Sequence, residues 1–155
     1  MNTSKQEILS HHTHFIEWVK SLNTLSNEQW RAPMEENKWS ISETVGHLIP
    51  WDEFVLEMRI PYFRLDNVIL PPAPDVEELN RQSSETSRHQ TREETLASFI
   101  SKRQGLMEAI SQLEDDLWTR QISIGPTKIT LKEYFTNLAQ HDHHHLNQIK
   151  NFLQK

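Results

Sequence analysis

The sequence repeats one local signal four times: a serine or threonine followed three residues later by a glutamate. The pairs are Ser4/Glu7, Ser40/Glu43, Thr91/Glu94 and Thr130/Glu133. In such a capping box, the hydroxyl and the carboxylate each accept a hydrogen bond from a backbone N–H group that the first turn of a helix leaves without a partner. The chain is therefore expected to begin a helix at each of these four points.

An apolar stripe with a period near 3.6 residues follows each predicted start, as expected for a helix that buries one face. No alternating run of useful length competes with this pattern, and three glycines in 155 residues are few for a turn-rich β protein. The prediction is an all-α fold, a four-helix bundle. In chain order, the stripes are Ile8, Phe15, Val19, Leu22; Ile41, Val45, Leu48, Trp51, Val55; Leu96, Phe99, Ile100, Met107, Ile110, Leu113; and Leu131, Tyr134, Phe135, Leu138, Ile149, Phe152.

The connections between these helices, residues 23–39, 64–90 and 114–129, differ in length. We expect one short helical turn in the first, near residues 26–30. An up-down-up-down bundle needs only short loops, so these lengths permit crossover connections. No repeat, low-complexity tract or linker divides the sequence, and residues 1–155 are predicted to form one domain.

Charge and composition exclude several classes of function. The 16 Lys+Arg and 22 Asp+Glu give a net charge of −6 with no basic run, which argues against nucleic-acid binding. No apolar run reaches the length of about 18 residues that a membrane span needs. The first residues lack the apolar segment of a secretory signal, so a cytoplasmic location is expected. The absence of cysteine excludes disulfides, thiolate zinc sites and a cysteine nucleophile.

Histidines on the second and fourth predicted helices form the candidate site. His141 and His145 lie one helical turn apart, about 5–6 Å between Cβ atoms, and on the helical wheel they fall beside or within the apolar stripe. His143 and His144 point away from it. His47 lies on the shoulder of its own stripe, so the three rings are expected to meet in a groove between helices. Three imidazoles on one divalent ion would leave a position open, as in catalytic rather than structural sites.

Polar residues near these histidines are candidates for supporting roles. Asp142 falls near the centre of the apolar stripe and needs a partner there, and accepting an N–H from a ligand imidazole is the usual arrangement. Gln148 faces the same groove. Glu43, one turn before His47, is the other nearby carboxylate, and His144 is an alternative donor to a ligand.

The remaining features have simpler interpretations. We expect His11, His12, His14 and His89 to be solvated or satisfied by neighbours, and Trp39 and Trp51 to belong mainly to the core. Pro50 removes the N–H that would bond the carbonyl of Gly46, so it either re-aims the turn of His47 or only curves the helix. Gly46 leaves a bare surface beside His47, open to a ligand or to a neighbouring helix.

Two segments resemble the DinB/YfiT-like superfamily of four-helix metal proteins: Trp39-Ser40-Ile41 with Gly46-His47-Leu48, and His141-Asp142-x-His144-His145-Leu146-x-Gln148-Ile149. The resemblance covers essentially the whole chain. It implies an up-down-down-up bundle, frequent homodimers, and one divalent ion, commonly zinc or nickel, on His47, His141 and His145. Pro50 departs from the run expected after Gly-His-Leu, which concerns the shape of the pocket rather than the ligands.

The resemblance leaves the reaction open, because characterised relatives are thiol-dependent transferases and isomerases while others are described as metal-dependent hydrolases. The interpretation that we favour is a transferase whose metal activates a low-molecular-weight thiol, since no protein cysteine competes for the ion. A hydrolase using the same ion would want a general base beside it. The third alternative is a non-enzymatic dimeric module that binds metal or another ligand. In the first two cases the partner is a small-molecule substrate.

Overall fold

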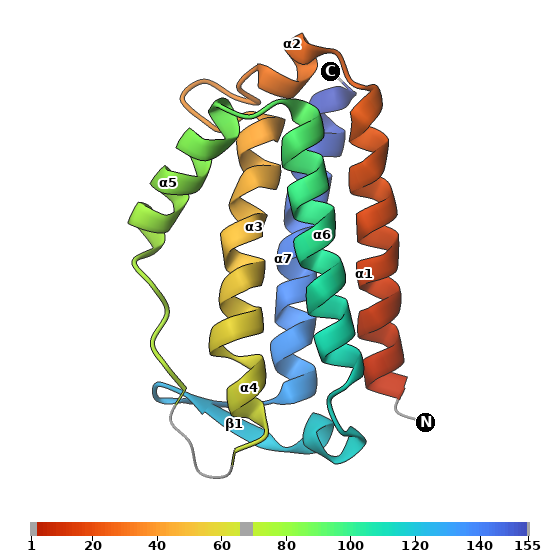
Figure 1. The fold of residues 1–155 in the computed structure, drawn as a ribbon, viewed down its shortest axis with the longest axis vertical. Helices are drawn as coiled ribbons and strands as arrows, with labels where there is room; N and C mark the ends of the chain where they lie inside the picture. The colour runs from red at the N-terminus through yellow and green to blue at the C-terminus, as the bar shows by residue number, and fades with distance from the viewer. Residues whose placement is uncertain (1–2, 66–69, 155) are drawn as a thin grey trace.

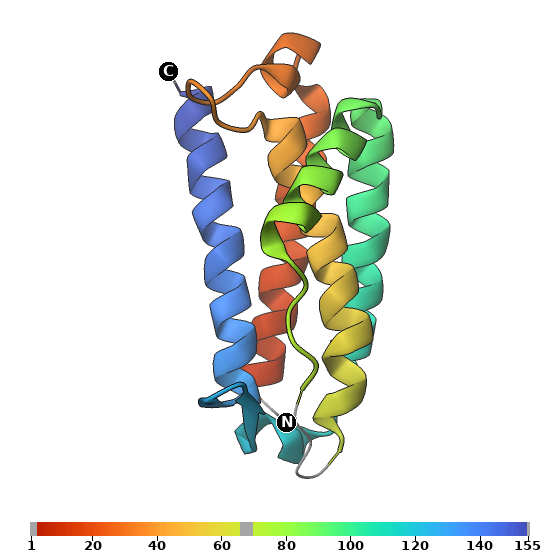
Figure 2. The same ribbon diagram turned by 90° about the vertical axis from the view of Figure 1, so that its left-hand side faces the viewer.

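A four-helix bundle forms the body of the protein in the computed structural model, which describes residues 3–65 and 70–154 (Figures 1 and 2). Its long helices are α1 (Thr3–Ser21), α3 (Ile41–Met58), α6 (Arg92–Ser111) and α7 (Leu131–Leu153). In Figure 1, α1 and α7 run upward and α3 and α6 run downward, so the order along the chain is up-down-down-up. The predicted bundle is confirmed.

Three of the four predicted capping boxes start these helices. The hydroxyls of Ser40, Thr91 and Thr130 each accept a hydrogen bond from the backbone N–H three residues later, and each glutamate side chain bonds back to the cap. The prediction at Ser4 is wrong, because α1 already includes Thr3 and Ser4 lies inside the helix. A box that we did not predict, Ser26 with Gln29, starts the short helix α2 (Asn27–Arg31) in the first connection.

The connections contain more regular structure than the sequence indicated. They hold the 3-10 turns Leu22–Thr24 and Asp115–Thr119, the short helix α4 (Ile60–Phe63), and an unpredicted helix α5 (Val76–Arg88) that runs back up beside α3 (Figure 1). An antiparallel hairpin of β1 (Gln121–Ile124) and β2 (Thr127–Thr130) precedes α7, with Gly125 in the left-handed region at φ 60°. The hairpin is too small to change the fold class. Part of the second predicted connection, residues 66–69, lies outside the described residues.

Helix α5 packs on α3 through small side chains. Ser83, Ser84 and Ser87 are its buried residues, and a Cβ atom on Gly46 would lie 2.8 Å from the Cβ of Ser87. Only glycine at position 46 permits this approach, since real Cβ atoms do not come so close. The bare surface at Gly46 is thus covered by a neighbouring helix. Pro50 lies inside α3, which is helical from Ile41 to Met58.

Two hydrophobic clusters fill the two halves of the bundle. One includes Val55, Leu106 and Phe135, and the other includes Leu48, Phe99 and Ile149. On each helix a buried polar residue separates the two clusters: His12 on α1, Asp52 on α3, Arg103 on α6 and Asp142 on α7. The core is therefore divided at mid-height by a polar layer, and the candidate site lies beside this layer.

The described helices include none that is both long and apolar enough to cross a membrane.

Candidate metal centre

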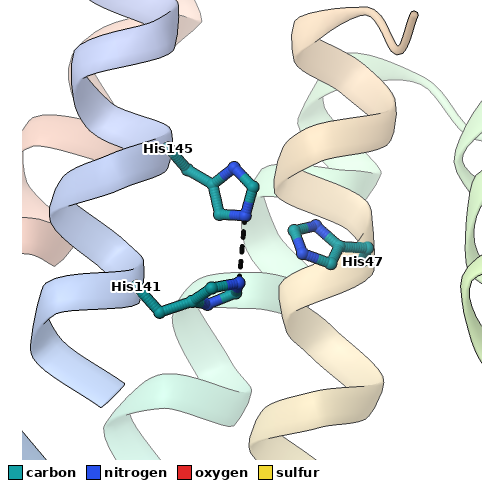
Figure 3. A group of neighbouring side chains, drawn as sticks. All are labelled: His47, His141 and His145. Atoms are coloured by element: carbon teal, nitrogen blue, oxygen red, sulfur yellow. Dashed lines mark hydrogen bonds between the residues drawn. The ribbon is translucent and has the colours of Figure 1, made fainter. Parts of the chain in front are cut away.

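The structure brings together the three histidines that the sequence selected. His47 extends from α3, and His141 and His145 extend from α7, one turn apart, toward it (Figure 3). One ring nitrogen from each lies within 4.8 Å of the others, and the Nε2 atoms of His141 and His145 are 3.2 Å apart. We call these residues the three-histidine cluster. That they bind a metal ion stays a prediction.

Hydrogen bonds fix the tautomers of two of the rings. Nδ1 of His47 lies 2.5 Å from the carbonyl oxygen of Thr44. Because a carbonyl only accepts, Nδ1 must carry the proton and Nε2 must carry the lone pair. Nδ1 of His145 lies 2.8 Å from Oε1 of Gln148, which leads to the same tautomer. Binding of the outer nitrogen to a carbonyl or amide oxygen is the arrangement usual for metal-ligating histidines.

The donor set fits a divalent ion. Two nitrogens about 2.0–2.1 Å from a tetrahedrally coordinated zinc are about 3.3 Å from each other, close to the 3.2 Å between the Nε2 atoms of His141 and His145. Without an ion, two neutral rings of this kind can share at most one proton between these atoms. Three imidazoles without a carboxylate or thiolate suit zinc, nickel or copper better than magnesium or calcium.

Electrostatics keeps these rings in the neutral form that binds metal. Burial, followed by the nearby ring of His145, lowers the pKa of His47 to about 4. Burial also lowers the pKa values of His141 and His145, although both are more exposed than His47. Protons therefore compete for these nitrogens less than they would for free histidine.

The predicted supporting residues have different environments. Gln148 contacts His145, as described above. Glu43 instead accepts hydrogen bonds from Ser40 and from Arg88, in the cap of α3. His144 is exposed, and its ring centroid lies 5.3 Å from that of His145.

Asp142 is buried as predicted, but its partners are not the predicted ones. Nη1 of Arg103 donates to it at 2.7 Å and Nε2 of His11 donates at 2.8 Å. The same guanidinium donates to Asp52 at 2.7 Å and 3.0 Å. Asp142 thus joins a polar network inside the bundle and accepts no hydrogen bond from a histidine of the three-histidine cluster. We call His11, His12, Asp52, Arg103 and Asp142 the Arg103 cluster.

Of the two environments expected for His12, solvated or satisfied by neighbours, the structure shows the second. Its side chain is buried, with 4 % of its surface exposed. Burial and the charge of Arg103 lower its pKa to about 3, so the ring is neutral. Its Nδ1 lies 3.2 Å from Nη1 of Arg103, which can only donate, so Nδ1 carries the lone pair. His11 is partly buried against Asp142, whereas His14 and His89 are exposed, as expected.

The carboxylates of the Arg103 cluster are held in place by charge. Burial raises the pKa of Asp52, to about 6, against the opposing effect of Arg103. For Asp142, burial alone would raise the pKa, but Arg103 and His11 outweigh it and the pKa lies below its usual range. His11, His12 and Asp142 also offer three ligand atoms within 4.8 Å. The guanidinium of Arg103 already occupies the place beside that carboxylate, so the chemistry there does not fit a metal cation.

Two cavities flank the three-histidine cluster. One, of about 470 Å³, lies between α3 and α7, and His47, His141, Asp52 and Trp51 contribute to its wall. The other, of about 450 Å³, is lined by Trp39, His145 and Gln148 among others. Trp39 and Trp51 are therefore cavity walls rather than core residues, which corrects the expectation for both. The ring of Trp39 lies 4.8 Å from that of His47.

The fold and the cluster together define a class of protein: an up-down-down-up bundle with a candidate three-histidine metal centre between its second and fourth long helices. The chain belongs to the DinB superfamily, whose sequence profile matches residues 12–149. A solved structure, that of YfiT from Bacillus subtilis, is similar over 97 % of this chain and 86 % of its own, with a TM-score of 0.78 and 17 % sequence identity. That protein is described as "a probable metal-dependent hydrolase with an unusual four-helix bundle topology". A comparison with curated proteins gives no match.

Proposed function

We propose that this protein is a divalent-metal-dependent enzyme that transfers a low-molecular-weight thiol to an electrophile, with the ion on His47, His141 and His145. The observation that carries the proposal is the convergence of three neutral imidazoles, with nitrogens within 4.8 Å of one another, at the wall of a cavity. Three protein ligands leave a coordination position for a substrate atom. Zinc or nickel is the ion that we expect.

A divalent ion held by three neutral histidines would lower the pKa of a thiol or of water at its remaining position, so that sulfur or oxygen becomes a nucleophile near neutral pH. The protein's own residues prepare this position. Thr44 and Gln148 orient two rings through their outer nitrogens. Fixing the ligands in this way favours binding without reorganisation.

The environment of the acids favours a thiol over water. Glu43 is engaged in the cap of α3 and in an ion pair with Arg88. Asp142 is engaged with Arg103 and His11. Neither carboxylate that the sequence offered as a general base is free to accept a proton beside the histidines. A thiol, with an ordinary pKa near 8.5, needs less help in losing its proton than water does.

A hydrolase is the second candidate function. The structural similarity to YfiT, described as a probable metal-dependent hydrolase, favours it, and so does the open position that both reactions share. In either case we propose a small-molecule substrate, because the cavity of about 470 Å³ has the size of a small-ligand pocket. A cytoplasmic homodimer of single-domain chains is part of the same proposal.

The test is a thiol-consumption assay with the zinc- or nickel-loaded protein and a small electrophile. We expect faster conjugation than with metal-free protein or with His47→Ala. Because the chain has no cysteine, all the thiol consumed comes from the substrate. In a cobalt-loaded sample, adding the thiol should produce a sulfur-to-metal charge-transfer band. Ester or amide hydrolysis without thiol would favour the hydrolase, and metal binding without turnover of either kind would favour a non-enzymatic module.

A further inference from the structure

The cavity between α3 and α7 has a buried arginine far from the histidines. Arg59, which follows α3 directly, lines this cavity together with His47 and His141. Only 4 % of its surface is exposed. Burying a guanidinium is costly unless a partner of opposite charge compensates for the lost water.

The partners of Arg59 are all uncharged. Its Nη1 donates to the carbonyl oxygens of Met58 at 3.2 Å and of Pro71 at 2.5 Å. Its guanidinium carbon lies 4.6 Å from the centroid of the Phe54 ring. A further hydrogen bond goes to Tyr134, which stays neutral because burial raises its pKa to about 12 against the effect of Arg59. Among residues 3–65 and 70–154, no carboxylate forms an ion pair with Arg59.

The second buried arginine shows what a satisfied guanidinium looks like in this protein. Arg103 donates to two carboxylates, Asp52 and Asp142, and is also almost completely buried. Both arginines line the same cavity. The upper end of the cavity therefore carries two acids with one guanidinium, whereas the lower end carries a guanidinium with neutral partners. In the metal-free protein, this distribution of charge favours an anion at the end of the cavity near Arg59 and disfavours one at the end near Asp52 and Asp142.

The distance between the two ends suits a short molecule. Phe54, which the guanidinium overlies, is seven residues after His47, and Tyr134 is seven residues before His141. At about 1.5 Å per residue, both helices place Arg59 about 10 Å from the histidines along the bundle. Between these ends the wall includes Val55, Leu106 and Leu138. An apolar chain would be in contact with this wall.

We propose that the cavity binds a small organic carboxylate, with its carboxylate group on Arg59 and its apolar chain directed toward the three-histidine cluster. A guanidinium matches a carboxylate with two parallel hydrogen bonds, and such charged pairs are stronger than neutral ones. The binding site stands on the cavity and on Arg59. Only the statement that the far end of the molecule reacts at the histidines rests on the function proposed above.

Calorimetric titration of the full-length protein with hexanoate and with 1-hexanol tests this proposal, in the absence of thiol and both with and without zinc. The two probes share the chain and differ in the charged group. We expect hexanoate to bind the wild-type protein about tenfold more tightly or better, the usual difference for a hydrogen-bonded charge. Equal binding of both probes, or tighter binding of 1-hexanol, would overturn the proposal without any variant being made.

Variants of Arg59 test whether the carboxylate group binds at this side chain. Arg59→Met should remove the preference for hexanoate, and Arg59→Lys should keep part of it. Arg64→Met is the matched control, since Arg64 is an exposed neighbour paired with Glu114 and does not line the cavity. A preference that survives in folded Arg59→Met, or that is lost in Arg64→Met, contradicts the assignment. If Arg59→Met fails to fold, Arg59→Lys and the wild-type comparison decide.

One further variant tests whether the chain itself supplies the anion. Asp66 is the one acidic side chain among the residues that the structure does not describe. Hexanoate binding that occurs only in Asp66→Asn would mean that the charge of Arg59 is neutralised from within, and would overturn the proposal. Failure of any of these titrations leaves the thiol assay unaffected, because no thiol and no turnover enters them. Conversely, a protein without thiol chemistry can still pass them.

Discussion

The three-histidine cluster and the Arg103 cluster lie next to each other. His141 of α7 belongs to the first cluster, and the next residue, Asp142, belongs to the second. In the Arg103 cluster, donors face acceptors: a guanidinium donates to two carboxylates and to the lone pair of His12. In the three-histidine cluster, the Nε2 atoms of His141 and His145 lie 3.2 Å apart and can share at most one proton, and no cationic side chain of the described residues donates to them. The first arrangement is complete without a ligand. The second is complete only with a cation or a shared proton, so the composition of a polar cluster matters less than whether its members satisfy one another.

The largest expected effect concerns the Arg103 cluster. Arg103→Met leaves Asp52 and Asp142 buried without their guanidinium, and should lower the free energy of unfolding by about 3–5 kcal/mol. Urea unfolding of the metal-free protein measures this. Lys102→Met is the control, because the ion pair of Lys102 with Glu53, at 4.0 Å, is partly exposed and worth about 0–1 kcal/mol. Similar losses in the two variants would mean that the Arg103 cluster has no special structural weight.

The next effect concerns the three-histidine cluster. His47→Ala, His141→Ala and His145→Ala should each weaken binding of zinc or nickel by more than about 100-fold, the upper range for loss of an outer partner, while changing the stability of the metal-free protein less than Arg103→Met does. Competition with a chelating dye measures the affinity. His144→Ala should bind normally. Loss of binding in His144→Ala with retention in His145→Ala would show that the wrong pair was chosen.

A smaller effect is expected from the residue that orients His145. Gln148→Ala removes the acceptor of Nδ1 and should weaken metal binding by about tenfold, the lower range for an outer partner. Asn147→Ala, an exposed neighbour on the same helix, is the matched control. Unchanged affinity in Gln148→Ala would show that the ring of His145 does not depend on this hydrogen bond.

The smallest effect is a pH dependence of the stability of the folded protein, which arises from His12 in the Arg103 cluster. Burial and Arg103 lower the pKa of His12 to about 3 from its ordinary value of 6.5. As pH falls below 6.5, the unfolded chain takes up a proton at this position that the folded protein does not, so stability decreases toward acid. His12→Gln, which can still accept from Arg103, should make this decrease less steep by up to about 1.4 kcal/mol per pH unit. Unfolding of the metal-free protein at several pH values checks it. His89→Gln, on an exposed histidine, should leave the slope unchanged.

The positions of the long helices could be predicted because local signals determine them. The boxes at Ser40, Thr91 and Thr130 start helices where the pattern predicted. Helix α5 was not predicted because its buried face consists of serines, and a search for apolar periodicity does not detect small polar residues. The hairpin was not predicted because each strand has four residues, too few for an alternating pattern to stand out.

The positions of the histidines could also be predicted, since the wheel separated His141 and His145 from His143 and His144. Helical wheels of α1 and α6 likewise indicate buried polar residues, which were not predicted. His12 lies four residues after Ile8 and three before Phe15, inside the apolar stripe of α1, and Arg103 lies four residues after Phe99 in that of α6. What sequence alone could not show is which buried polar residues meet. Asp142 pairs with residues from two other helices, His11 on α1 and Arg103 on α6, and only the packing of those helices determines that choice.

Two kinds of chain segment form the wall of the cavity, the long helices and the connections between them. The histidines lie on the long helices α3 and α7, whereas Val76 and Asn80 come from α5 and Ile124 from the hairpin. Connections of this kind tolerate insertion and replacement far better than core helices do. Substitutions in α5 and in the hairpin could therefore change which ligands the cavity binds without moving the histidines. Grafting α5 and the hairpin of one relative onto another would be the corresponding way to exchange substrate preference in the laboratory.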